Sequence, residues 1–201
     1  HLTGLEGISV ERTIELIPSA TVSQNTRFVG SFAPLPAGGD PGRLVNEPVG
    51  FDVGLTAKFI PSSAVTVDLA INPDFAQAEV DAQRVNLTRY SLFFPERRQF
   101  FIEGADSLKM GINTLGFGSR LLELVYTRAI GLSPTGQPIP ILAGSKLTGK
   151  AAGFDIGVLD VQTDDWVEKP GENFAVARVR KEMLGRSYMG AIVTSREGGA
   201  T

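Results

Sequence analysis

The chain has 201 residues, enough for one domain with a substantial core, and its 42% hydrophobic and 20% charged residues exclude an intrinsically disordered polypeptide. A net charge of −3 offers no basic footprint, so we expect no nucleic-acid partner. Cysteine is absent and the single histidine is His1, which excludes disulfide frameworks, thiolate metal sites and catalysis by an interior imidazole.

The predicted elements begin with two strands, at 8–17 and 21–32, which precede the Pro- and Gly-rich loop APLPAGGDPG. The clearest strand follows at 50–59, where apolar and polar side chains alternate strictly with a period of two. Residues 64–72 alternate in the same way. The short sequence IPSS between these two runs predicts a hairpin.

Further strands are predicted at 121–130, 141–150, 154–161, 174–181 and 187–195. The short sequences AAG and EMLGR join two pairs of them into hairpins, and Gly-rich turns recur along the chain. The pattern therefore predicts an all-β fold, an antiparallel meander of about nine to ten strands, each mostly eight to eleven residues long.

The face opposite the apolar side chains is polar and is expected to carry charges of both signs. Its members are Asp52, Lys58, Asp68, Asp155, Arg178 and Arg180. In a soluble sandwich this is the face that meets water, whereas in an outer-membrane barrel it lines the lumen while the apolar face meets lipid. The alternation by itself leaves both interpretations open.

A long segment without a clear strand follows the central hairpin, and such segments in compact chains are usually functional or disordered. Residues 73–106 are rich in Phe and in paired charges, so we predict an inserted segment that packs in or across the barrel as a plug or rim element. Pro95 suits the first turn of a helix, and ERRQFF is expected to form one or two helical turns. The alternative is a solvated surface loop.

Three acidic residues near the start of this segment are candidate calcium ligands, because Ca²⁺ binds several oxygen ligands that lie close in sequence. They are Asp74, Glu79 and Asp81. The EF-hand pattern is absent, and a turn-forming Asn-Pro-Asp with solvated acids explains the same residues. Calcium is thus the one candidate ion, and no other cofactor is expected.

Carboxylates in the second half of the segment are candidates for catalysis. Glu96, Glu103 and Asp106 include the pair of acid and base groups that a hydrolase requires. The neighbouring arginines are expected to lower the pKa values of these carboxyl groups, which suits a general acid poorly. The candidate binding residues are Asp74, Arg97, Arg98 and Trp166.

Four short blocks carry a family resemblance. They are Asn-Pro-Asp-Phe at 72–75, Phe-Phe-Pro-Glu-Arg-Arg at 93–98, Glu-Gly-Ala-Asp at 103–106 and Tyr-Thr-Arg-Ala-Ile-Gly at 126–131. From about 49 to 195 the chain resembles a bacterial domain of unknown function that usually follows a carbohydrate-binding module of the family-9 type. The last block departs from the family pattern at Thr127 and Ala129.

This family is regarded as an outer-membrane β-barrel. The resemblance implies that residues 1–201 form the N-terminal part of a larger barrel in the bacterial outer membrane, in contact with its lipid, with the upstream binding module missing from this chain. It implies binding or passage of an external solute, a carbohydrate being suggested by the accompanying module alone. Two alternatives are a hydrolase of unknown substrate that uses carboxylates of 71–106 and a soluble β-sandwich interaction module.

Overall fold

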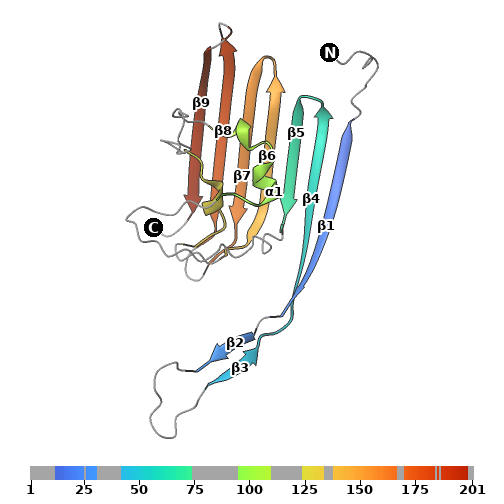
Figure 1. Ribbon diagram of the computed structural model, residues 1–201, viewed down its shortest axis with the longest axis vertical. Helices are drawn as coiled ribbons and strands as arrows, with labels where there is room; N and C mark the ends of the chain where they lie inside the picture. The colour runs from blue at the N-terminus through green and yellow to red at the C-terminus, as the bar shows by residue number, and fades with distance from the viewer. Residues whose placement is uncertain are drawn as a thin grey trace.

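A computed structural model describes residues 12–24, 26–30, 42–73, 95–109, 124–133, 138–166, 170–183, 185 and 187–198 (Figure 1). Its strands are β1 (Thr13–Ser23), β2 (Thr26–Val29), β3 (Arg43–Asn46), β4 (Gly50–Ser62), β5 (Val65–Ile71), β6 (Ile141–Ala151), β7 (Phe154–Thr163), β8 (Glu172–Met183) and β9 (Ser187–Gly198). Its short helices are α1 (Gln99–Ile102), η1 (Ala105–Ser107) and η2 (Thr127–Ala129). No helix in these ranges is long and apolar enough to cross a membrane.

Seven strands form one antiparallel sheet in the order β1-β4-β5-β6-β7-β8-β9. Strands β2 and β3 pair separately and form an arm that extends beyond the ends of β1 and β4 (Figure 1). The expected all-β antiparallel architecture is confirmed, and so are the three hairpins β4–β5, β6–β7 and β8–β9. Closure of the sheet into a barrel is not confirmed, because across the described residues the sheet is open, with β1 at one edge and β9 at the other.

The predicted boundaries at the N-terminal strands were wrong at Pro18. The structure has one continuous strand, β1, that passes through Pro18 and pairs it with Leu55. Proline lacks an N–H donor but is tolerated on an edge strand, and β1 is such an edge. The predicted strand 21–32 is divided, because β1 ends at Ser23 and β2 begins only at Thr26.

The predicted strand at 121–130 was also wrong over the part that the structure describes, 124–130. Residues 127–129 form the turn η2, whose Ile130 amide donates to the carbonyl of Thr127. The apolar residues that suggested a strand instead pack against the sheet: Ile130 is buried, and Val125 packs on the same core. These apolar side chains are therefore buried by packing on the face of the sheet, and their backbone does not pair with it as a strand.

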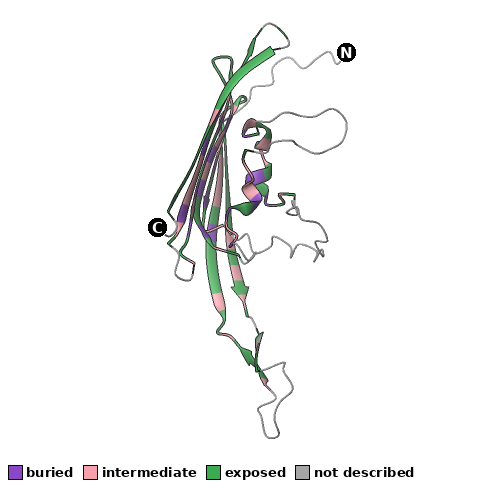
Figure 2. Cartoon of the chain, turned by 90° about the vertical axis from the view of Figure 1, so that its left-hand side faces the viewer, coloured by how far each residue is buried: buried purple, intermediate pink, exposed green. Residues whose placement is uncertain are grey.

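The register places the predicted polar residues on one face of the sheet. Asp68 lies opposite Lys146, and Asp155 lies opposite Arg180. We call this side the covered face, because α1 and its flanking residues lie on it (Figure 2). The opposite side, which presents residues such as Phe51 and Val53, is the bare face, and its large apolar side chains are exposed.

The hydrophobic core lies between the covered face and the segments that cover it. The sheet contributes Ala70, Ile141, Leu159, Val161 and Val176, and the covering residues contribute Phe100, Phe101, Leu108 and Ile130. Two glycines allow the close approach. A Cβ on Gly144 would lie 3.0 Å from the Phe100 ring, and one on Gly157 would overlap the carbonyl oxygen of Ser107.

Gly157→Val should therefore push η1 away from the sheet, at a cost of about 1–3 kcal/mol in the free energy of unfolding. The readout is limited proteolysis by trypsin, because the peptide bond after the buried Arg98 should become accessible. Ala177→Val adds comparable bulk on the bare face and is the matched control. Equal protection of both variants would contradict tight packing of η1 on β7.

Candidate functional site

The covering segment, residues 95–109, begins as extended chain and then makes a single helical turn. Helix α1 starts at Gln99, later than the predicted start within ERRQFF, because Arg98 still has an extended backbone. The Glu96 carboxylate explains the delay. Its Oε1 accepts the backbone N–H groups of Arg97 at 3.0 Å and of Arg98 at 3.1 Å, which holds 96–98 in a non-helical conformation.

A buried lysine of the sheet holds this helix in place. The Nζ of Lys146, which is 1% exposed, donates to the carbonyl oxygens of Phe100 and Glu103, the latter at 2.8 Å. The same Nζ lies 3.1 Å from Oδ2 of Asp68, its neighbour on β5. Three acceptors match the three N–H donors of the ammonium group, so the charge is compensated without water.

A second ion pair lies within the covering segment, and its arginine also binds residues 124–133, which we call the return segment. Arg98 Nε and Nη2 donate to the two oxygens of Glu96, at 2.9 and 2.8 Å. The guanidinium also donates to the carbonyls of Thr127 and Ile130, each at 2.7 Å, and stacks 4.2 Å from the ring centroid of Phe101. A forked arginine thus ties the two segments together.

The two catalytic candidates in this region are bound by partners that favour their ionised form. Burial alone raises the pKa of Glu96, but hydrogen bonds and charge from Arg98, helped by Thr127, outweigh it, and the net pKa is lowered. Hydrogen bonds from Lys58 and then Gln99 lower the pKa of Glu103. Both carboxylates are therefore ionised near neutral pH and poorly suited to donate a proton.

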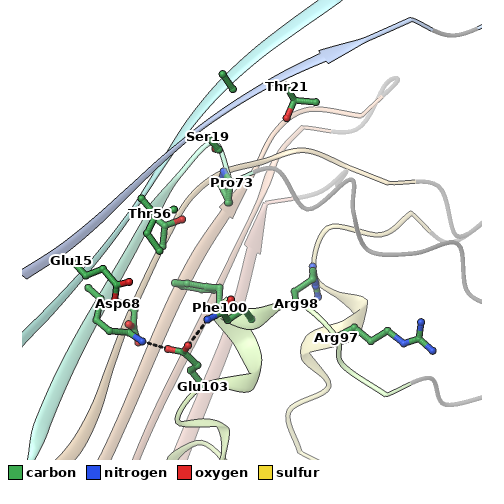
Figure 3. Close-up of a pocket in the computed structure, with 14 residues that line it drawn as sticks. Glu15, Ser19, Thr21, Thr56, Asp68, Pro73, Arg97, Arg98, Phe100 and Glu103 are labelled. Atoms are coloured by element: carbon green, nitrogen blue, oxygen red, sulfur yellow. Dashed lines mark hydrogen bonds and ion pairs between the residues drawn. The ribbon is translucent and has the colours of Figure 1, made fainter.

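A groove of about 540 Å³ lies between the covering segment and strands β1, β4 and β5 (Figure 3). Its lining carries both signs of charge, with Glu15 and Glu103 facing Lys58, and the hydroxyl groups of Thr21 and Thr56. The Lys58–Glu103 ion pair bridges its floor and the covering segment. The lining is suited to a polar solute rather than to an apolar one.

The predicted site residues are distributed unevenly around this groove. Arg97, Arg98 and Glu103 line it, and Glu96 pairs with Arg98 beside it. Asp106 is exposed and paired with Lys109 at 3.0 Å. Trp166 is half-buried just beyond β7, away from the groove.

The calcium candidates Asp74, Glu79 and Asp81 lie outside the described residues. Among the residues that are described, no group of three acidic or imidazole side chains is placed to hold a metal ion. Lys146, which the sequence reasoning missed, had a detectable signal. It occupies the polar phase of the expected strand 141–150, between Gly144 and Thr148.

Residues 44–155, more than half of the chain, match the family model described as Domain of unknown function (DUF5916). The chain belongs to this family. The DUF5916 match spans the covering segment, the return segment and the hairpin that carries Asp68. No curated protein and no solved structure matches the chain.

Replacing the buried lysine tests the anchor. Lys146→Met should lower the free energy of unfolding by about 3–5 kcal/mol, because it leaves the Asp68 carboxylate buried without its cation. Denaturant unfolding followed by the fluorescence of Trp166, the only tryptophan, measures the change. Lys150→Met, on an exposed residue of the same strand, should have little effect. Adding Asp68→Leu to Lys146→Met should restore part of the loss, and no recovery would contradict a pairwise anchor.

Acid should loosen the two segments. Because the folded-state pKa of Glu96 lies below its ordinary value of 4.5, its stabilising contribution is complete above that pH and is lost as the pH falls through the lowered pKa. Glu96→Gln should cost about 1–3 kcal/mol at neutral pH and flatten the loss of stability below pH 4.5. Unfolding midpoints of the variant and the parent, measured from neutral pH to below pH 4.5, test this prediction. The same acid dependence in both proteins would contradict the role of the Glu96 carboxylate.

Proposed function

We propose that this chain forms part of a β-barrel in the bacterial outer membrane, and that the complete barrel binds or passes an external polar solute. The observation that carries the proposal is that charged side chains are buried on one face of the sheet while large apolar side chains are exposed on the other. On the covered face Lys146 and Asp68 are 1% and 5% exposed, whereas on the bare face Phe51 and Val53 are 67% and 56% exposed. Lipid is the solvent in which this arrangement is favourable.

The extent of the bare face supports lipid contact. Its exposed apolar residues span the whole sheet and include Ile14, Leu16, Phe51, Val53, Leu69, Ile71, Val158, Val179 and Val193. Soluble monomers rarely expose continuous apolar surface on this scale. A soluble sandwich would need a second sheet against this face. On β7–β9 the apolar residues give way to Asp160 and Glu197 at one end of the strands, as at the border of a hydrocarbon layer.

Strand length supports the same assignment. Crossing the hydrocarbon core takes about 9–11 tilted residues. Six strands of the sheet reach this length, since β1, β4, β6, β7, β8 and β9 have 11, 13, 11, 10, 12 and 12 residues, whereas β5 is shorter at 7. Unpaired backbone groups are not tolerated in lipid, so the proposal requires further strands to pair with the edges at β1 and β9. Some outer-membrane barrels hold a loop or a helix inside the lumen, and in this proposal the covering segment lies in the lumen in the same way.

The interior supports a polar solute. The charges on the covering segment and the wall are compensated in pairs, as burial in a lumen demands, and the groove beside them presents hydroxyl groups and both signs of charge. A carbohydrate fits this lining and is the solute implied by the resemblance. The ionised state of Glu96 and Glu103 favours binding or passage over a hydrolase.

Lysine on the bare face tests the orientation of the sheet. Val53→Lys and Leu69→Lys should each cost about 2–4 kcal/mol near mid-depth and reduce assembly into membranes. Thr21→Lys places the same charge on the covered face, beside the groove, and should assemble normally. The measurement is the urea-resistant, membrane-associated fraction of the full-length protein. Normal assembly of both bare-face variants, or a monodisperse β-rich protein in plain buffer, would refute lipid contact.

A further inference from the structure

The connections between strands sort by length to opposite ends of the sheet. The register puts the strand ends that flank 63–64, 152–153 and 184–186 at one end of the sheet, because Val65 lies opposite Gly149 and Phe154 lies opposite Lys181. We call this end the short-turn rim. The strand ends that flank the connections 24–49, 72–140 and 164–171 are all at the other end, the long-connection rim (Figure 1).

Strand β1 fits the same division. Its first residue, Thr13, pairs with Ile60 near the short-turn rim, and its last, Ser23, pairs with Gly50 toward the long-connection rim. The β2–β3 arm extends from this second rim (Figure 1). Every connection between neighbouring strands of the main sheet thus obeys one rule, short at one rim and long at the other.

Outer-membrane barrels have short turns on the periplasmic side and longer loops on the extracellular side. We infer that the short-turn rim faces the periplasm, and that the long-connection rim with the β2–β3 arm is the surface presented to the cell exterior. This inference rests on the proposed function and adds the direction of insertion to it.

The direction of insertion assigns the covering segment to an external loop. Residues 95–109 belong to the connection 72–140, which leaves β5 and returns to β6 at the long-connection rim. The segment lies against the wall, where Lys146 holds α1 and Arg178 Nη1 donates to the Ser107 carbonyl at 2.9 Å. Residues 95–109 of the external loop are therefore folded inward, and an external solute meets the groove between these residues and strands β1 and β4.

The absence of cysteine makes single-cysteine labelling a direct test. Ser63→Cys and Ser187→Cys mark exposed positions at the short-turn rim, and Leu44→Cys and Pro170→Cys mark exposed positions on the arm and at the long-connection rim. Each variant of the full-length protein is exported in a Gram-negative host. Intact cells are then treated with a maleimide on a polyethylene glycol chain too large to cross the outer membrane, with and without permeabilisation of that membrane.

Leu44→Cys and Pro170→Cys should react equally before and after permeabilisation, whereas Ser63→Cys and Ser187→Cys should react only after it. The reverse pattern in a membrane-embedded protein would overturn the inferred direction and leave the barrel proposal standing. Recovery of all four variants in the soluble fraction, with labelling independent of rim, would overturn the barrel proposal itself. The two failures are thus distinguishable in one experiment.

Discussion

A buried ammonium group is the constraint on which the other features depend. Lys146 projects from the wall of the sheet with no access to water, so it requires three acceptors within the protein. Asp68 supplies one from the neighbouring strand, and the carbonyls of Phe100 and Glu103 supply the others. Satisfying this single charge therefore fixes where α1 sits, which in turn positions the Phe side chains of the core and the wall of the groove.

Covering the polar face rather than the apolar one has consequences for the whole molecule. The core is confined to one side of the sheet, and the opposite side is left with exposed apolar side chains. The Arg98–Glu96 pair extends the cover by joining the block at 93–98 to the block at 126–131. Two motifs far apart in the sequence, both inside the DUF5916 match, thus act as one structural unit.

The differences between expectation and structure arise where tertiary contacts override local pattern. A strand is predicted at 121–130, but residues 127–130 form a turn, because Ile130 is buried on the sheet and Arg98 binds the carbonyls of Thr127 and Ile130. The strands predicted at 8–17 and 21–32 leave a gap that includes Pro18, but β1 runs through this residue because an edge strand tolerates proline. Helix α1 starts only at Gln99, because the Glu96 side chain accepts the backbone N–H groups of Arg97 and Arg98 and these residues stay extended ahead of the first turn.

The sequence by itself determined strands β4 to β9, the three hairpins and the division of the sheet into an apolar and a polar face, although it also predicted a strand at 121–130 that does not form over the described residues. These follow from period-two alternation and short turns, which are local properties. Only the tertiary structure decided that Lys146 anchors α1, that Arg98 joins two distant segments and that Lys58 meets Glu103. Those contacts join residues about 30–50 positions apart, and spacing along a chain carries no information about distance across a folded sheet.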